Sequence, residues 1–258
     1  MSDSDTLRQL YLDLMKNCLT GLIYEDAPTA VMFPPWFVDR HPKEFVRKWR
    51  EWGRDVPRQA HTMIGLRRMD NIQYCVEQVL ADNVPGDLIE TGVYRGGATI
   101  WMRALLKAYG VTERQVWVAD SFEGLPTPDL GKYPLGEGWA NAEGKLACSL
   151  DQVKHNFEVY GLLDEQVHFL KGWFKDTLPN SSIEQVAVMR LDGDLYESTL
   201  DALTYLYPRL SPGGFAVFDD YPVVDPCRRA VNDYRNANGI TEDIIDIDGM
   251  SVYWRRRH

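Results

Sequence analysis

The chain has 258 residues, of which 45% are hydrophobic and 26% are charged, so it can bury a core, and a disordered or fibrous protein is excluded. It carries 28 basic and 38 acidic residues, and the net charge of −10 argues against a nucleic acid as its main partner. The N-terminus lacks the pattern of a secretory signal, and no apolar run reaches the ~18 residues that a membrane span needs. We therefore expect a cytoplasmic protein that binds neither nucleic acid nor membranes.

Residues 1–83 are expected to form a helical and lid extension ahead of the main domain. Residues 6–24 carry leucines and aromatic residues at the spacing of an amphipathic helix, and this apolar helix suggests a contact between the subunits of a homo-oligomer. Residues 26–58 mix prolines with tryptophans and phenylalanines, which is typical of a packed surface arm or of a lid over a ligand. Helical periodicity resumes from residue 61 to residue 82.

From residue 84 to residue 258, short apolar runs alternate with helical segments. The runs cover residues 87–93, 115–122, 167–174, 186–194 and 214–221, and the helical segments cover residues 96–109, 149–160, 198–208 and 226–238. The alternation predicts an α/β fold with a doubly wound, mostly parallel, Rossmann-like sheet that helices cover on both faces. Two more strands, joined by a turn at Asp248-Gly249, complete a seven-stranded sheet as an antiparallel C-terminal hairpin.

The ends of the first three runs suggest a nucleotide-like ligand, because ligands of doubly wound sheets bind beyond the carboxyl ends of the strands. The turn from Glu90 to Gly97 is rich in glycine and opens a helix with free amides, although its spacing does not match the dinucleotide fingerprint G-x-G-x-x-G. Asp120, followed by Ser121 and Phe122, could accept both ribose hydroxyls of an adenosine. The segment 172–174 places two aromatic residues where they could flank a purine or pack in the core.

Four aspartates follow the fourth and fifth runs. Asp192 and Asp194 end one run, and Asp219 and Asp220 end the next, so four carboxylates should meet at one edge of the sheet. Such a cluster repels itself unless a cation is present, and carboxylate oxygens are the ligands that Mg²⁺ prefers. We expect a magnesium site here, with loop-capping aspartates as the alternative.

Several motifs together resemble the macrocin O-methyltransferase family. They are ETGVYRGG, VWVADSFEGLP, KGWFKDTLP, RLDGDLYEST and LSPGGFAVFDDY, and the resemblance continues from the first helix through HTMIGLRRMDN to the terminal VYWRR. It implies a class I methyltransferase domain over residues 84–258 that uses S-adenosylmethionine and Mg²⁺. It also implies a methyl acceptor that is a glycosylated natural product, such as a macrolide, methylated on a deoxysugar hydroxyl.

The resemblance and the strand ends together assign the site residues. In the family, the turn that matches residues 90–97 holds the methionine end of the cofactor. The residues expected to contact the cofactor are Thr62, Met63, Glu90, Thr91, Gly92, Arg95, Gly96, Gly97, Asp120, Ser121, Phe122, Gly172, Trp173 and Phe174. The residues that match the metal ligands are Asp192, Asp219 and Asp220.

Asp194 matches the proposed general base of that family. Related catechol O-methyltransferases place a lysine one turn beyond their first metal aspartate, but here the chain reads Asp194-Leu195. The base is therefore Asp194 or, from the N-terminal side, His61. Such a base would remove the proton of a sugar hydroxyl that a metal ion has made more acidic.

Two irregular segments are expected to enclose the acceptor, residues 26–60 and residues 126–147, with Trp36, Tyr133 and Trp139 as candidate contacts. Three other functions stay open. One is an O-methyltransferase for a catechol or another small vicinal diol, the second is an NAD-dependent oxidoreductase, and the third is a binding module without catalytic activity. The missing dinucleotide fingerprint and the four aspartates argue against the last two.

Overall fold

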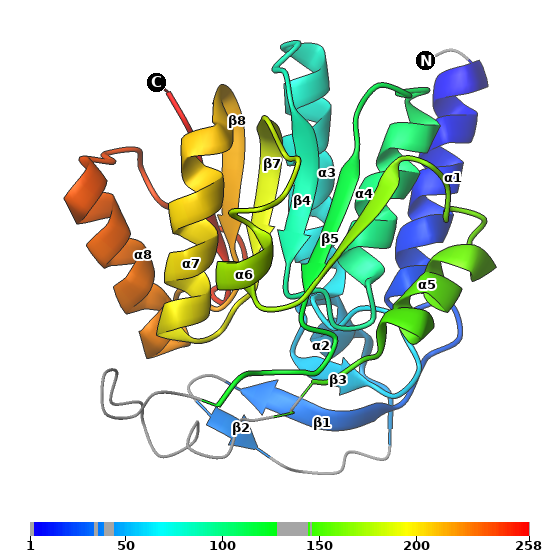
Figure 1. The fold of residues 1–258 in the computed structure, drawn as a ribbon. Coiled ribbons are helices and arrows are strands. Elements are labelled where there is room, and N and C mark those ends of the chain that lie inside the picture. Colours follow the sequence, from blue (N-terminus) through cyan, green and yellow to red (C-terminus); the bar gives the residue numbers. More distant parts are fainter. Residues whose placement is uncertain (1–2, 34–35, 39–43, 128–143, 145, 258) are drawn as a thin grey trace.

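The computed structural model describes residues 3–33, 36–38, 44–127, 144 and 146–257. Its main feature is a seven-stranded sheet in the order β6-β5-β4-β7-β8-β10-β9 (Figure 1). The strands are β4 (Asp87–Thr91), β5 (Val116–Asp120), β6 (Val167–Lys171), β7 (Val186–Leu191), β8 (Leu210–Phe218), β9 (Ile245–Asp246) and β10 (Val252–Arg255). Strands β4 to β8 run parallel, and β10 lies antiparallel between β8 and β9. The predicted fold class and its C-terminal hairpin are confirmed.

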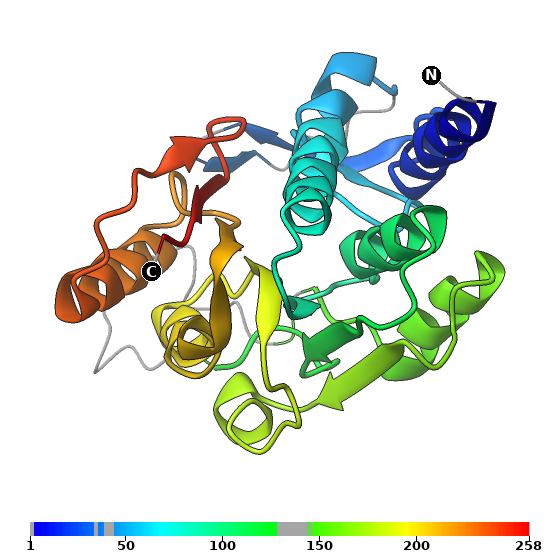
Figure 2. The same ribbon diagram turned by 90° about the horizontal axis from the view of Figure 1, so that it is seen from above.

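Helices cover both faces of the sheet, and Figure 2 shows the sheet between two groups of them. One group is α1 (Asp3–Leu19), α3 (Gly65–Ala81), α4 (Gly97–Ala108) and α5 (Leu150–Val159). The other is α6 (Phe174–Thr177), α7 (Tyr196–Leu206), the 3₁₀ helix η2 (Tyr207–Arg209) and α8 (Asp225–Asn238). Neighbouring strand residues face opposite cores: Leu88 packs with the first group and Ile89 with the second.

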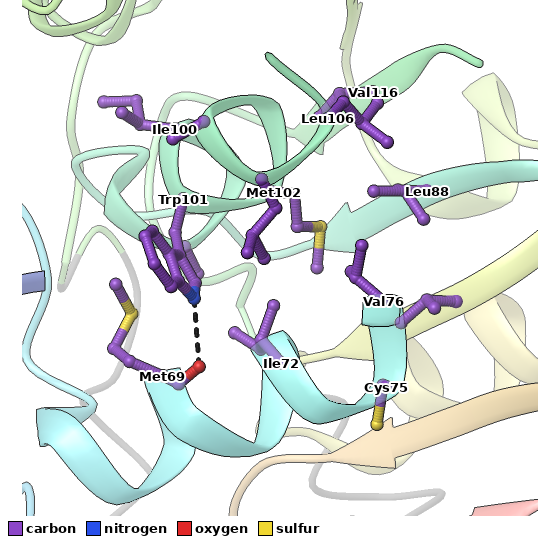
Figure 3. Packing of buried hydrophobic residues seen from close by; sticks show 14 of the residues in the cluster. Met69, Ile72, Cys75, Val76, Leu88, Ile100, Trp101, Met102, Leu106 and Val116 are labelled. Carbon is purple, nitrogen blue, oxygen red and sulfur yellow. Dashed lines mark hydrogen bonds between the residues drawn. The ribbon is translucent and has the colours of Figure 1, made fainter. Parts of the chain in front are cut away.

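The core between α3 and α4 joins the N-terminal extension to the sheet (Figure 3). Trp101 of α4 is fully buried, and its indole Nε1 donates a hydrogen bond to the carbonyl of Met69 in α3 at 2.9 Å. Leu12 of α1 and Ile72 of α3 belong to the same core as Leu88 of β4. The core is thus continuous across residue 83, and the division into segments 1–83 and 84–258 stays a prediction.

The N-terminal arm contains a small sheet that the sequence pattern did not predict. Its strands are β1 (Pro28–Phe33), β2 (Trp36–Val38) and β3 (Asp55–Pro57), all antiparallel, with α2 (Arg47–Glu51) before β3. The prolines that suggested irregular chain include the first residue of β1 and the last of β3, where a missing amide does little harm to a sheet. Figure 1 shows this sheet beyond the carboxyl ends of β4 and β5.

Helix α1 is shorter than predicted, because Gly21 turns the chain with φ 70° soon after Leu19. The helix leaves Leu7, Leu10 and Leu14 exposed, and these leucines form the apolar surface that suggested a contact between subunits. That contact stays a prediction. Among the described residues, the helices are too short or too polar to span a bilayer.

Candidate functional site

A cavity of about 700 Å³ lies at the carboxyl edge of the parallel strands. It is lined by the ends of β4, β5, β7 and β8, by the segment before α3, by the starts of α6 and α7, and by the turn between β9 and β10. The predicted site residues that line it are Thr62, Met63, Glu90, Gly92, Asp120, Ser121, Trp173, Phe174, Asp192, Asp194, Asp219 and Asp220. The cavity thus gathers residues predicted for the cofactor and residues predicted for the metal.

Four non-glycine residues with left-handed backbone follow the strands at this edge. They are Tyr94 after β4 (φ 49°), Phe122 after β5 (φ 59°), Asp194 after β7 (φ 53°) and Asp220 after β8 (φ 62°). Such a conformation is unfavourable by about 1–3 kcal/mol for a bulky residue and less for aspartate. Strain of this kind persists only where the surrounding structure holds it, and it is typical of ligand sites.

The glycines of the turn after β4 allow close approaches within the protein, and their contact with a cofactor stays a prediction. A Cβ on Gly92 would lie 1.8 Å from the carbonyl oxygen of Asp192, and a Cβ on Gly97 would lie 2.4 Å from that of His61. These glycines therefore let other parts of the protein backbone approach. The remaining predicted cofactor residues, Thr91, Arg95, Gly96, Gly97, Phe122 and Gly172, lie outside the lining of the cavity. Gly172 still contacts a lining residue, because it donates its amide to the carbonyl of Asp120 at 2.9 Å.

Glu90 places an unpaired carboxylate oxygen at the cavity. The residue is 2% exposed, and its Oε1 accepts a hydrogen bond from Arg190 Nη1 at 2.6 Å. Its other oxygen, Oε2, is buried and has no partner among the described residues. Burial raises the pKa of Glu90 to about 8, although Arg190 acts in the opposite direction. This carboxylate is therefore suited to a positively charged ligand group.

Asp120 is held rigidly at the end of β5. Its Oδ2 accepts the amide of Val93 and its Oδ1 accepts the amide of Phe122, each at 2.7 Å. Burial raises the pKa of Asp120, and the hydrogen bonds offset this rise only in part. Each carboxylate oxygen has a further lone pair, so Asp120 can still accept hydroxyl groups from a ligand.

Three aspartates in the lining of the cavity form a cluster, and we call them the carboxylate cluster: Asp192, Asp194 and Asp220. One oxygen of each lies within 4.8 Å of the others. Burial, together with the charges of neighbouring carboxylates, raises the pKa of Asp194 to about 7 and that of Asp220 well above its usual range. Three converging carboxylate oxygens are a donor set that fits a hard divalent cation such as Mg²⁺.

Asp219 does not belong to this cluster and forms ion pairs with two arginines. Its two oxygens lie 3.1 and 2.8 Å from Arg68 Nη1, and its Oδ1 lies 2.9 Å from Arg190 Nη2 and also accepts the hydroxyl of Ser251. Burial alone would raise its pKa, but Arg190 and Arg68 outweigh that effect and hold it at about 2. The structure thus groups two predicted metal ligands with the predicted base Asp194, and the role of Asp219 as a ligand stays a prediction.

Sequence reasoning missed the two arginines. Arg190 is 1% exposed, lies within β7 and reaches Glu90, Asp192 and Asp219. The sequence did offer one signal for Arg190, because it is a charged residue inside the apolar run that precedes the aspartates. Arg68 lies on α3, and its buried partners are far away in the sequence, so no local pattern identifies them.

His61 lines the cavity at the start of α4, where its carbonyl accepts the amide of Gly97 at 3.0 Å. Its Nδ1 lies 2.8 Å from the hydroxyl of Tyr160. Burial lowers its pKa, and Arg95 and His155 act in the same direction, so the ring is neutral at pH 7. Its main-chain contact ties it to the turn after β4.

The predicted lid is described only in part. Met32 of β1 lines the cavity, so the arm does reach the site. Trp36 belongs to β2, but its side chain lies outside the described part of the structure, as do Tyr133 and Trp139. Their contacts with an acceptor stay predictions.

Comparisons with known proteins identify the family of this chain. The family model described as Macrocin-O-methyltransferase (TylF) matches residues 8–256. An 8-demethyl-8-(2,3-dimethoxy-alpha-L-rhamnosyl)-tetracenomycin-C 4'-O-methyltransferase from Streptomyces olivaceus is 56% identical, over 98% of this chain and 94% of that protein. A mycinamicin III 3''-O-methyltransferase from Micromonospora griseorubida is 50% identical, over 96% of each chain.

A solved structure, that of the O-methyltransferase NovP, matches with a TM-score of 0.87 and 48% identity over 97% of this chain and 100% of that one. The family match and this likeness cover nearly the whole chain, including every strand of the seven-stranded sheet. The chain belongs to the macrocin O-methyltransferase family and is an O-methyltransferase.

Proposed function

We propose that this enzyme transfers the methyl group of S-adenosylmethionine to a hydroxyl of a deoxysugar on a glycosylated natural product, with the help of Mg²⁺. The observation that carries the proposal is one cavity with an unpaired buried carboxylate oxygen, Glu90 Oε2, and the carboxylate cluster in its lining. The relatives support the acceptor class. One is named for 4'-O-methylation of a rhamnosyl tetracenomycin and another for 3''-O-methylation of mycinamicin III.

The cofactor would lie along the ends of β4, β5 and β6. Glu90 Oε2 would accept the ammonium group of the methionine end, and the first turn of α4 after Gly97, where Ala98 lines the cavity, would face its carboxylate. Asp120 would accept the ribose hydroxyls, and Trp173 and Phe174 would flank the adenine. Acidic side chains outnumber basic ones in the lining of this cavity, which favours a cofactor with a positively charged sulfonium.

The carboxylate cluster would hold the divalent cation through Asp192 and Asp220. When bound, Mg²⁺ lowers the pKa of an adjacent hydroxyl and fixes the direction of two neighbouring sugar oxygens. Asp219 would have to give up contacts with Arg68 or Arg190 to join as a third ligand.

Asp194 would act as the general base. It lies in the cluster, and its left-handed backbone turns the chain sharply after β7. In the proposed reaction the acceptor hydroxyl would lose its proton to Asp194 and form the O–C bond. Bound S-adenosylmethionine would supply the methyl group, with the electron pair of the broken C–S bond returning to sulfur. The products are the methyl ether and S-adenosylhomocysteine. An in-line displacement of this kind depends on alignment, which a rigid cavity edge supplies.

The test is a methyl-transfer assay with labelled S-adenosylmethionine, a panel of deoxysugar glycosides and a panel of catechols, each with Mg²⁺ or with EDTA. We expect transfer to a glycoside that stops in EDTA and returns with Mg²⁺. Transfer at full rate in EDTA would contradict the role of the metal, and transfer only to catechols would contradict the acceptor class. Tighter calorimetric binding of NAD than of S-adenosylmethionine would favour an oxidoreductase instead.

A further inference from the structure

A buried chain of charges connects α3, the end of β8 and the turn between β9 and β10. Arg68 of α3 is 4% exposed and donates through Nη1 to both oxygens of Asp219, at 3.1 and 2.8 Å. Its Nε donates to Asp248 Oδ2 at 2.9 Å. Asp248, in the hairpin turn, is 4% exposed. One side chain of the N-terminal extension therefore holds two elements from the end of the chain.

The hairpin turn holds Asp219 from a second direction. Asp248 Oδ1 accepts the amides of Met250 and Ser251, each at 3.0 Å, which shapes the turn. The Ser251 hydroxyl then donates to Asp219 Oδ1. Val252 pairs with Phe218, so the register of β10 on β8 brings this turn beside the end of β8. Arg68 and the turn thus restrain the same carboxylate.

Asp219 and Asp220 follow one another in a backbone segment that hydrogen bonds hold on both sides. Asp219 donates its amide to the carbonyl of Leu191 at 3.0 Å, which joins the end of β8 to the end of β7. Asp220 follows with φ 62°, and its carbonyl accepts the amides of Val223 and Val224 at 2.9 and 2.7 Å. A strained residue of this kind keeps its conformation only while its neighbours are held.

We propose that Arg68 is a positioning residue for the cation site: with Asp248 and Ser251 it fixes Asp219, and thereby keeps Asp220 in the carboxylate cluster before any cation binds. This inference rests on the proposed function, because it assumes that the cluster binds a divalent cation. Arg68 acts through Asp219, and its role requires the hairpin turn as much as the helix.

Two effects of Arg68 on cation affinity oppose each other. Its positive charge repels a cation, whereas its hydrogen bonds keep the ligands in place. The charge is already balanced by Asp219 and Asp248, whose oxygens lie within 3.1 Å of its guanidinium. The repulsion is therefore weak, and the loss of ligand orientation outweighs it. Removing partners that orient metal ligands typically weakens metal binding about 10- to 100-fold.

The N-terminal arm reaches the same contacts. Arg68 Nη2 donates to the carbonyl of Gly53 at 3.3 Å, and Arg54 Nη2 donates to the carbonyl of Asp248 at 2.8 Å. A Cβ on Gly65 would lie 2.3 Å from the amide nitrogen of Gly53, so these glycines allow α3 to approach the turn after α2. The arm, the helix and the hairpin turn are thus fastened together beside Asp219.

The experiment compares Arg68→Gln with a matched control, Arg103→Gln. Arg103 is also buried and binds Asp164 through two hydrogen bonds, at 2.9 and 2.6 Å, but neither residue lines the cavity. The full-length variants are titrated with Mn²⁺ and with S-adenosylhomocysteine by calorimetry, and their melting temperatures are recorded. We expect Arg68→Gln to weaken Mn²⁺ binding about 10-fold or more. We expect its affinity for S-adenosylhomocysteine to stay within about twofold, and Arg103→Gln to keep the Mn²⁺ affinity of the wild type.

Ser251→Ala and Arg68→Lys keep the proposal testable where Arg68→Gln does not fold. Ser251→Ala removes one hydrogen bond to Asp219 and should weaken Mn²⁺ binding about threefold. Arg68→Lys keeps the charge without the fork of donors and should fall between Arg68→Gln and the wild type. Unchanged or tighter Mn²⁺ binding in these variants overturns the positioning role. A wild-type protein that binds S-adenosylhomocysteine but no Mn²⁺ overturns the proposed metal site itself.

Discussion

The residues proposed for the cofactor and those proposed for the cation are built into the fold differently, and we call the two groups the cofactor end and the cation end. The cofactor end, residues 90–97 and 120–122, comes from two turns that each follow one strand. The cation end, which we define as the carboxylate cluster with Arg190 and Asp219, depends on side chains of α3, β7, β8 and the hairpin turn. The hydrogen bonds between Arg68 and Asp219 join residues that lie 151 positions apart in the sequence. The cation end should therefore respond to substitutions far away in the sequence. The cofactor end should respond mainly to its own turns, apart from the ion pair of Glu90 with Arg190, which lies 100 positions away.

The largest expected effect is on catalysis at the cation end. Asp194→Asn should lower kcat about 10²- to 10⁴-fold, because an amide cannot take the proton of the acceptor. Asparagine also tolerates the left-handed backbone of this position, so the fold should be kept. The measurement is steady-state kinetics with a saturating glycoside, combined with calorimetric titration of S-adenosylhomocysteine, whose affinity should not change.

His61→Asn is the matched test of the other candidate base. His61 precedes α3 and lines the cavity beside the start of α4, so its replacement should change cofactor affinity more than kcat. A large loss of kcat in His61→Asn, with near wild-type turnover in Asp194→Asn, would identify His61 as the general base.

The next effect is on stability. Arg190→Gln leaves Glu90, Asp192 and Asp219 without their shared cation in a buried place, and breaking such a network typically lowers the free energy of unfolding by about 3–5 kcal/mol. Urea denaturation, followed by circular dichroism, measures it. Arg103→Gln should lose less, because its partner Asp164 is 24% exposed and can be hydrated. Equal losses in the two variants would show that the network adds no particular stability.

The sequence predicted the sheet because its strands are nearly continuous apolar runs, and it predicted the turns of the cofactor end because each lies within a few residues of a strand. It also placed the aspartates at one edge. It did not predict the small sheet of β1, β2 and β3, in which β1 begins and β3 ends with a proline, nor the pairing of Asp219 with Arg68. A buried ion pair between distant residues leaves no local pattern, since only the folded chain brings its members together.

A smaller effect tests the cofactor end. Glu90→Gln removes the charge that would bind the ammonium group, and a hydrogen bond to a charged group contributes about 1.5–3 kcal/mol. The affinity for S-adenosylhomocysteine should fall about 10- to 100-fold. The affinity for 5'-methylthioadenosine, which lacks the amino-acid part, should stay within about twofold. Equal losses for both ligands would place Glu90 at the nucleoside instead.

The smallest expected effect is the pH dependence of cation binding. Burial and neighbouring carboxylates raise the pKa of Asp192 to about 6 and that of Asp194 to about 7, so the cation-free cluster carries protons at neutral pH. A cation needs the carboxylates ionised and must displace these protons. The Mn²⁺ affinity should therefore fall as the pH is lowered through about 7, by up to about tenfold per pH unit for each displaced proton.

Calorimetry in two buffers of different ionisation enthalpy would count the protons that Mn²⁺ releases. Asp194→Asn should release fewer protons near pH 7, because its amide does not titrate, while the pH dependence of S-adenosylhomocysteine binding should be unchanged. The pH dependence of S-adenosylhomocysteine binding should instead follow Glu90, which belongs to the cofactor end and has a pKa of about 8. If Asp194→Asn altered both dependences alike, the two ends would titrate as one unit, and the separation between local turns and long-range ion pairs would not extend to their electrostatics.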